Sequence, residues 1–520
     1  MIGLLDYGAG NVRSVWCAIR RLGFSVREIQ RPEDLFSCEK LIFPGVGNFG
    51  SVMESLARRG LAGPLRRYLM EGRPFLGICV GMQTLCETSE ESPGVSGLGV
   101  IKGKVRRFPS GALSVPHMGW NGVRLCRASA LFSNCADEKF YFDHSYFVEV
   151  DREEKKAVLS ETDYGIPFAS AIEKGAIAAV QFHPEKSGPA GLRLLRNFLA
   201  GEKRMAEPKP SAGQTRMAKR IVACLDVRED DDGRIVVTKG DRYDVREGGK
   251  VRDFGDPVEL AERYCEEGAD EIAFLSITAF RREPLSDLPM LEILRRVSER
   301  VFVPLTIGGG IRPYRDTAGK EVCGLDIASA YFRAGADKVS LGGQAVEEAT
   351  VFTSTGSPPP DSSIRQISRL YGSQAVVVSV DPRRVFVASP EATTHHTVRL
   401  PDGRLCWYQC TVKGGREGRD IDAWQMCRAC ESLGAGEILL NSIDADGRGE
   451  GFDLALIRDI SRSVFIPVIA SSGAGSADHF AEVFSRTDVE AALAAGIFHR
   501  RKVTIREVKE RLRHTGIEVR

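Results

Sequence analysis

The sequence predicts an α/β protein with two domains, of which the second is a (β/α)8 barrel with an internal half-barrel repeat. Residues 1–203 alternate short apolar strands with helical segments, the pattern of an α/β sheet. From residue 218 to 520 several segments recur in related form, which indicates a duplicated half-barrel. Residues 204–217 between them are polar, contain proline and lack periodicity, and we interpret them as a linker.

In the first domain four apolar runs are predicted to be strands of one sheet: Ile2–Leu5, Leu41–Phe43, Phe75–Ile78 and Ala178–Phe182. Ligands of such sheets bind beyond the carboxyl ends of the strands. We therefore expect the functional site of this domain at that edge.

In the second domain the repeat pairs residues 221–226 with 376–381, 268–278 with 434–444, and 301–310 with 464–473. Adding residues 336–341 and 489–494 gives eight strands separated by helical segments, a (β/α)8 barrel slightly longer than the usual ~250 residues. We interpret the surplus as loops or insertions at residues 233–252, 313–324, 353–363 and 385–413.

The composition is that of an ordinary globular protein, with 43% hydrophobic and 27% charged residues. The net charge of +1 provides no field for nucleic acid or an anionic membrane. No apolar run reaches membrane-spanning length, and Met1–Tyr7 already reads as a strand rather than a signal peptide, so we expect a cytoplasmic protein.

The 13 cysteines show no pairing rhythm, which favours a reducing compartment. Cys427 and Cys430 lie in a helical stretch, and we interpret them as structural. Neither domain shows metal-ligand spacing, and His395-His396 lies in an insertion without a carboxylate cluster. We expect neither a metal nor another cofactor.

Cys79 is the strongest candidate for a nucleophile. It ends the apolar run Phe75–Ile78, and Gly77 and Gly81 flank it, as a sharp strand-to-helix elbow without room for Cβ atoms requires. The start of a helix favours a thiolate, His183 could take its proton, and Glu185 could orient that imidazole. A lone cysteine on an apolar strand is ordinarily a core residue, but the elbow followed by His-Pro-Glu favours a catalytic triad.

Two aspartates are predicted to face each other across the barrel mouth. Asp226 and Asp381 end the first and fifth strands, which the repeat places on opposite sides. Two carboxyl groups in unlike surroundings can serve as acid and base. Each could instead cap the loop that follows it, and the duplication favours the catalytic interpretation.

Glycine-rich turns follow four barrel strands and predict two anion sites. Gly308–Gly310 and Ser472–Gly475 end strands three and seven, and Gly342-Gly343 and Ala495-Gly496 follow strands four and eight. Such turns before a helix form anion nests, so two of them on opposite sides imply a bisphosphate substrate. Lys239 on the first loop could cover that substrate or could be an ordinary solvated lysine.

Both domains resemble known families. Pro44–Gly50 is similar to the oxyanion loop of class I glutamine amidotransferases, and Pro116–Asn121 with His144–Tyr146 resembles their histidine-pathway branch. The barrel resembles the matching cyclase in the segments 223–227, 336–340 and 435–439. Over nearly its full length the chain is similar to the fused imidazole glycerol phosphate synthases of fungi and plants, and residues 407–416 resemble an insertion typical of that form.

The resemblance implies that glutamine is hydrolysed at Cys79 and that its ammonia enters the barrel. There it would react with the bisphosphate intermediate PRFAR, giving imidazole glycerol phosphate and AICAR, with Asp226 and Asp381 as acid and base. Gln83 and Glu91 would hold glutamine. The full set of expected substrate contacts is Gly47, Gln83, Glu91, Lys239, Gly310, Gly342, Gly343, Asp446, Gly447, Gly473, Ala495 and Gly496.

The resemblance also implies a charged gate for ammonia at the barrel floor, made by Arg220, Glu271, Lys338 and Glu437. All four lie at the amino ends of predicted strands, and charges buried there without partners would be costly, so we expect a mutually paired ring. The same ring could be purely structural. Beyond it, an apolar interior including Val222, Ala273 and Val377 could shelter ammonia, and we expect weak glutaminase activity until the barrel is occupied.

Three residues depart from the family pattern. Ser276 stands where an acidic residue or its amide is usual, Gly343 where a phosphate-binding threonine is common, and Asp143 where an apolar residue is usual. The rival interpretations are the neighbouring barrel isomerase of the pathway, which lacks a glutaminase, and a non-catalytic sensor, which the intact predicted catalytic residues disfavour. We expect both domains to pack together in one chain, as a monomer.

Overall fold

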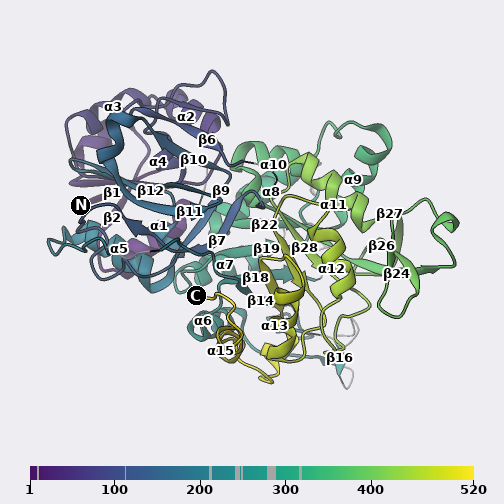
Figure 1. Ribbon diagram of the computed structural model, residues 1–520. Helices are drawn as coiled ribbons and strands as arrows, with labels where there is room; N and C mark the ends of the chain where they lie inside the picture. The colour runs from purple at the N-terminus through teal and green to yellow at the C-terminus, as the bar shows by residue number, and fades with distance from the viewer. Residues whose placement is uncertain are drawn as a thin grey trace.

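The computed structural model describes residues 1–8, 11–109, 111, 113–209, 213–239, 246–247, 250–277, 288–315 and 319–520. Figure 1 shows two bodies side by side, with the N-terminal domain in purple to blue and the barrel in teal to yellow. Among these residues no helix is both long and apolar enough to cross a membrane. Parts of the expected linker (residues 210–212) and of the expected insertions (residues 240–245, 248–249 and 316–318) lie outside the described residues.

The N-terminal domain is built on an eight-stranded mixed sheet. Its strands, in spatial order, are β2 (Val26–Ile29), β1 (Ile2–Leu5), β3 (Lys40–Phe43), β4 (Phe75–Ile78), β13 (Ile177–Val180), β12 (Ile166–Lys174), β11 (Val158–Tyr164) and β8 (Arg124–Leu125). The first five run parallel, and the four apolar runs predicted from the sequence coincide with β1, β3, β4 and β13. Each face of the sheet has its own apolar core.

The remaining elements of this domain cover or extend that sheet. The helices are α1 (Val12–Arg21), α2 (Phe49–Arg58), α3 (Ala62–Met70), α4 (Val80–Gln83) and α5 (Gly188–Ala200). A small sheet holds β5 (Thr88–Ser89), β6 (Gly103–Arg107) and β10 (Tyr146–Val150). An antiparallel ribbon of β7 (His117–Asn121) and β9 (Phe140–His144) completes the domain.

The second domain is a closed barrel, because β14 pairs with β30 as well as with β18. Its eight parallel strands are β14 (Arg220–Glu229), β18 (Glu271–Ser276), β19 (Leu305–Gly308), β22 (Lys338–Leu341), β23 (Val376–Val380), β28 (Glu437–Asn441), β29 (Val468–Ser471) and β30 (Ala491–Ala494). All eight coincide with predicted strands, which confirms the (β/α)8 fold. An apolar cluster fills the interior, and a larger one lies between the strands and the outer helices.

The outer layer consists of α6 (Pro257–Glu267), α7 (Leu288–Ser298), α8 (Gly324–Ala334), α9 (Gly343–Thr355), α10 (Ser363–Tyr371), α11 (Ala423–Leu433), α12 (Leu454–Ser461), α13 (Ala477–Arg486), α14 (Gly496–His499) and α15 (Ile505–His514). Helix α6 illustrates how sequence sets their ends. Asp256 accepts hydrogen bonds from the amides of Val258 and Glu259, Pro257 opens the helix, and Gly268 ends it at φ 100°.

The segments interpreted as loops or insertions are more ordered than the sequence indicated. Residues 385–413 belong to a four-stranded antiparallel sheet of β24 (Pro382–Val387), β25 (Thr397–Arg399), β26 (Leu405–Val412) and β27 (Glu417–Asp422), which projects from the barrel in Figure 1. Residues 233–252 contain β15 (Ile235–Thr238) and the pair β16 (Arg246–Glu247) and β17 (Lys250–Val251). Residues 313–324 contain the antiparallel pair β20 (Tyr314–Arg315) and β21 (Glu321–Val322). Residues 353–363 comprise the end of α9, the connection 356–362 and the first residue of α10.

The N-terminal domain contacts the barrel at the amino ends of its strands. Asn11 donates to Asp337 at 2.9 Å, and Lys186 pairs with the same carboxylate at 2.6 Å, directly before β22. Trp120 donates its indole N–H to the carbonyl of Asp270, directly before β18. The N-terminal domain therefore covers the barrel floor, and the mouth at the opposite end of the barrel is formed by the barrel's own loops.

Candidate active sites

Cys79 lies on the predicted elbow between β4 and α4. Its backbone has φ 51° and ψ −108°, a strained conformation for a residue with a side chain. A Cβ on Gly77 would lie 2.7 Å from the carbonyl oxygen of Gly81, and one on Gly81 would lie 2.5 Å from that of Phe43. The glycines are therefore dictated by backbone contact. Because α4 has only four residues, any dipole effect on the thiol is small.

His183 and Glu185 are brought to this thiol. His183 Nδ1 lies 2.9 Å from Glu185 Oε1, and both side chains are buried. Burial alone would lower the pKa of His183, but the charges of Glu185 and Cys79 and hydrogen bonds to both raise it well above its usual range. An imidazole so placed can accept the thiol proton and hold it.

Two polar side chains complete the surroundings of the thiol. Gln181, which directly follows β13, donates from Nε2 to the Cys79 sulfur at 3.5 Å. Gln83 donates to the side-chain oxygen of Gln181 at 3.2 Å and to the carbonyl of Tyr146 at 2.8 Å. Gln83, expected to contact glutamine, thus also holds Gln181 in place.

The expected oxyanion loop packs directly on the elbow. A Cβ on Gly45 would lie 1.7 Å from the carbonyl oxygen of Ile78, and Gly47 has φ 141°. Glu91 accepts a hydrogen bond from the Phe49 amide at 2.7 Å, and burial raises the pKa of this carboxyl to about 7. The Asn48 amide donates across the domain interface to the carbonyl of Leu370 at 3.3 Å.

At the barrel mouth, Asp226 and Asp381 have unlike partners. Asp226 pairs with Lys239 at 3.0 Å, and the same ammonium lies 3.7 Å from Asp446. Asp381 instead accepts hydrogen bonds from neutral groups, Asn441 at 2.7 Å and Ser379 at 3.2 Å. Burial raises the pKa of Asp381. Such a difference in surroundings is what an acid–base pair requires.

The two predicted anion nests have matching geometry. Gly342 before α9 has φ −108° and ψ −94°, and Ala495 before α14 has φ −124° and ψ −74°. Gly310 and Gly473 adopt positive φ angles of 73° and 97° after β19 and β29, and Gly447 has φ 73°. Gly343 and Gly496 are the first residues of their helices. The repeat therefore provides two similar sets of backbone amides at the mouth, as a bisphosphate would need.

The four charged residues at the barrel floor form the mutually paired ring expected from the sequence. Arg220 bonds Glu271 at 2.8 Å and also Glu437, and Lys338 pairs with both carboxylates at 2.6 Å. All four side chains are fully buried. Burial alone would lower the pKa of Lys338, but Glu271 and Glu437 raise it. The four side chains therefore form one closed, mutually paired ring.

Lys338→Met is expected to lower the free energy of unfolding by about 3–5 kcal/mol, because it leaves two buried carboxylates sharing one guanidinium. Thermal melting of the purified variant measures the loss. Lys102→Met, which breaks an ion pair between side chains exposed by 60% and 81%, is the matched control and should leave the melting temperature unchanged. Equal melting temperatures for both variants would contradict a tightly coupled ring.

The β7–β9 ribbon lies between the thiol site and this ring. The backbone N–H of His183 donates to the carbonyl of Tyr141 on β9 at 2.8 Å. On β7, the other strand of the ribbon, the sulfur of Met118 accepts a hydrogen bond from the Lys338 ammonium at 3.5 Å. A single two-stranded element therefore connects the triad with the barrel floor.

Sequence reasoning missed several polar contacts at these sites. Gln181 could have been found as a polar residue directly after β13 and two residues before His183. Asn441 could have been found as the residue that ends β28 at the mouth. The Lys186–Asp337 ion pair joins two domains and leaves no local signal. Cys427 and Cys430 are buried free thiols of α11, in agreement with a structural role.

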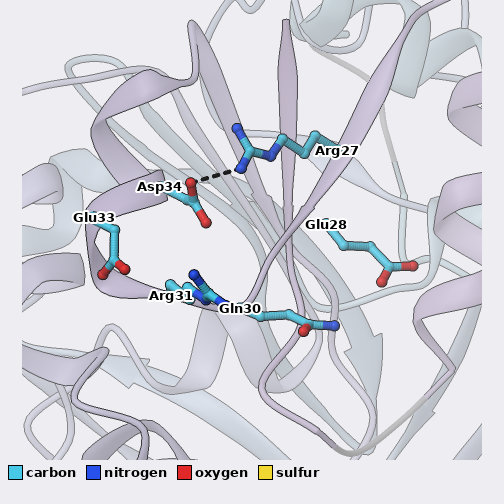
Figure 2. A pocket seen from close by; sticks show the side chains of 6 residues that line it. All are labelled: Arg27, Glu28, Gln30, Arg31, Glu33 and Asp34. Atoms are coloured by element: carbon cyan, nitrogen blue, oxygen red, sulfur yellow. Dashed lines mark hydrogen bonds and ion pairs between the residues drawn. The ribbon is translucent and has the colours of Figure 1, made fainter.

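Two surface cavities lie outside these sites. Figure 2 shows one of about 380 Å³ on the N-terminal domain, where Arg27 and Asp34 pair at 2.8 Å. It is lined by Arg27, Glu28, Gln30, Arg31, Glu33 and Asp34. A second, of about 480 Å³, lies at the domain interface beside Trp16, Arg59 and Tyr371. None of the predicted site residues lines either cavity.

Comparison with known proteins matches each domain to a family. Residues 3–201 match glutamine amidotransferase class I, and residues 220–504 match the histidine biosynthesis protein family. The imidazole glycerol phosphate synthase hisHF, chloroplastic, of Arabidopsis thaliana is 53% identical over 530 residues, covering 100% of this chain and 89% of that protein.

Two further relatives define the extent of the similarity. The imidazole glycerol phosphate synthase hisHF of Schizosaccharomyces pombe is 50% identical over 547 residues, covering 100% of both chains. The imidazole glycerol phosphate synthase subunit HisF of Methanoregula boonei is 41% identical over 304 residues, covering 58% of this chain and 99% of that protein. The similarity to the two-domain proteins thus extends over the whole chain, and the similarity to the archaeal subunit over its barrel.

Proposed function

This chain belongs to the fused imidazole glycerol phosphate synthases, and from that premise we propose which of its residues carry the reaction. The family joins a glutamine amidotransferase domain to a cyclase barrel of histidine biosynthesis. We assign residues 1–203 to the glutaminase, 204–217 to the linker and 218–520 to the cyclase. The limits of the two family matches and the gap between α5 and β14 support these boundaries.

Glutamine hydrolysis takes place at Cys79. The thiolate attacks the side-chain amide of glutamine, and His183, oriented by Glu185, returns the proton to the leaving nitrogen, which departs as ammonia. Water then releases glutamate from the thioester by attack in which His183 acts as base. Gly47 and its neighbours in the loop contribute amides to the oxyanion, and Glu91 and Gln83 position the substrate.

The ammonia passes to the mouth through the barrel interior. This proposal rests on the order of inward-pointing side chains along the barrel strands. Inward-pointing residues alternate along each strand, so β14 presents Arg220, Val222, Cys224 and Asp226 in sequence. Arg220 of the ring stands at one end of this series and Asp226, one of the two proposed acid–base residues, at the other, with apolar side chains between them. Strand β28 repeats the arrangement with Glu437, Leu439 and Asn441.

Between these ends the interior is lined by Val222, Cys224, Ala273, Val377, Leu439, Ile469, Ala491, Leu493 and Ala495. An apolar lining does not favour the charged ammonium ion, so it carries nitrogen in the neutral, nucleophilic form. In the closed ring, Arg220, Glu271, Lys338 and Glu437 separate this lining from the glutaminase. The four residues therefore act as a gate that must rearrange for each ammonia molecule.

At the mouth, the two nests hold the phosphates of PRFAR, one through Gly310, Gly342 and Gly343 and the other through Gly473, Ala495 and Gly496. Lys239, Asp446 and Gly447 contact the part of the substrate between them. Asp226 and Asp381 exchange protons as ammonia adds, the intermediate is cleaved and the imidazole ring closes. The products are imidazole glycerol phosphate and AICAR.

Glutamine turnover is expected to rise at least about tenfold, ~1.4 kcal/mol in the barrier, when PRFAR occupies the barrel. The physical link is the contact of the oxyanion loop and α2 with α10 of the barrel. The backbone N–H of Asn48 in the loop donates to the carbonyl of Leu370, and the Ser51 hydroxyl of α2 donates to the carbonyl of Arg369 at 3.3 Å. The assay follows glutamate, PRFAR and imidazole glycerol phosphate together. Equal glutamate formation with and without PRFAR would contradict the link, and glutamine-independent loss of PRFAR would contradict the function.

We also propose that the enzyme acts as a monomer in the cytosol. Both sites lie in one chain, so no partner subunit is needed to complete either of them. The 13 cysteines are free thiols, and a reactive Cys79 among them suits a reducing compartment. Size-exclusion chromatography with light scattering tests the first statement, and microscopy of the tagged protein in its own cells tests the second.

A further inference from the structure

We propose that Asp143 and Tyr141 form a binding station for ammonia between the glutaminase triad and the charged ring. The inference rests on the proposed ammonia path and adds a site on it.

The β7–β9 ribbon presents one face to the barrel floor. Successive strand residues point to opposite faces, and directly paired residues share a face. Met118 pairs with Asp143, and Trp120 pairs with Tyr141, so these four side chains lie on one face. Met118 contacts Lys338 of the ring, and Trp120 bonds the carbonyl of Asp270, which identifies this face as the one toward the barrel.

On this face two oxygen atoms are buried without a partner among the described residues, Asp143 Oδ1 and Tyr141 Oη. The residues are only 7% and 2% exposed. Buried polar atoms are almost always satisfied by protein, water or ligand, because an unmade hydrogen bond is costly. Two such atoms two residues apart on one strand face are therefore free to hydrogen-bond a small molecule.

The charged groups around Asp143 fix its place on the path. Lys338, Glu437 and Glu271 of the ring and His183 of the triad are all close enough to influence this carboxyl. The electrostatic influence of Asp143 and of ring residues Glu271 and Arg220 also reaches Tyr141. The backbone of Tyr141 accepts a hydrogen bond from His183, and Met118 opposite Asp143 contacts Lys338, so the station lies between the triad, where ammonia leaves glutamine, and the ring.

The chemistry of the two groups suits ammonia. Burial raises the pKa of Tyr141 well above its usual range, so its hydroxyl stays protonated and can donate to the nitrogen lone pair. Asp143 offers an acceptor for an N–H, and burial raises the pKa of its carboxyl to about 8. A molecule with one lone pair and several N–H groups satisfies both oxygen atoms at once.

The test measures imidazole glycerol phosphate formed per glutamate in the full chain, at saturating glutamine and PRFAR, for Asp143→Val, Asp143→Asn, Tyr141→Phe and the Asp143→Val/Tyr141→Phe double variant. We expect a ratio near one for the unmodified chain. Asp143→Val should lower the ratio roughly two- to tenfold, the range for one lost hydrogen bond, and the double variant should lose less than the product of both. Asp143→Asn keeps an acceptor and should lose least.

Glu149→Gln removes an exposed carboxylate of the same domain and is the matched control, with an unchanged ratio expected. Because unfolded molecules make neither product, partial misfolding does not alter the ratio. A ratio near one in Asp143→Val and Tyr141→Phe would show that the site holds only a structural water, which overturns the station and leaves the path intact. A ratio far below one in the unmodified chain would overturn the path itself.

Discussion

Cys79→Ser is expected to lower glutamine-dependent synthesis by at least about 10³-fold, the scale on which removal of a covalent nucleophile acts. The serine hydroxyl fits the elbow, but an oxygen nucleophile lacks the intrinsic nucleophilicity of sulfur. Synthesis driven by added ammonium should be unchanged, because the barrel mouth does not involve the thiol. Parallel assays with glutamine and with ammonium measure both quantities.

The matched control is Cys126→Ser, which changes an exposed thiol of the same domain and should leave both activities unaltered. Equal losses with glutamine and with ammonium would mean that Cys79 supports the fold rather than the chemistry. Undiminished glutamine-dependent synthesis would remove Cys79 from the mechanism altogether.

Asp226→Asn and Asp381→Asn should each lower cyclisation by about 10²–10⁴-fold, the usual contribution of a positioned acid or base. The amide keeps the shape of each carboxyl, so the loss reports the proton and the charge. Asp226→Asn also leaves the ammonium of Lys239 without the partner that it has at 3.0 Å. Consumption of PRFAR with saturating ammonium measures the effect, and glutamate formation without PRFAR should persist.

Asp488→Asn is the control, because this side chain is 71% exposed and far along the chain from either mouth aspartate. If one mouth variant loses cyclisation and the other keeps it, the two carboxyl groups do not act as a pair. Loss of basal glutaminase activity in either variant would indicate damage to the fold.

The features that could be predicted from the sequence are those with a strong local cause. The elbow requires glycine at 77 and 81 because neighbouring carbonyl groups occupy the space of a Cβ, and that requirement is visible in the residue types. The barrel was predictable because the half-repeat places Asp226 and Asp381 at corresponding strand ends. The four ring residues were identified by the family resemblance, and their pairing followed from charge at four strand starts, where burial demands it.

The features that could not be predicted depend on contacts between distant segments. Residues 385–413 were interpreted as a loop or an insertion, although residues 405–412 are rich in β-forming side chains and would have supported a strand. The antiparallel pairs β16–β17 and β20–β21 have strands of two residues, too short for a periodic signal. Asp143 was noted as a departure, but its place between His183 and Lys338 results from domain packing alone.

We propose that ammonia from Cys79 reaches Asp226 and Asp381 without entering bulk water. The decisive experiment adds an ammonia-consuming enzyme in excess to a reaction with glutamine and PRFAR. We expect the amount of imidazole glycerol phosphate still to equal that of glutamate and the trap to collect nothing. Capture of most of the nitrogen by the trap, with a matching loss of imidazole glycerol phosphate, would contradict it.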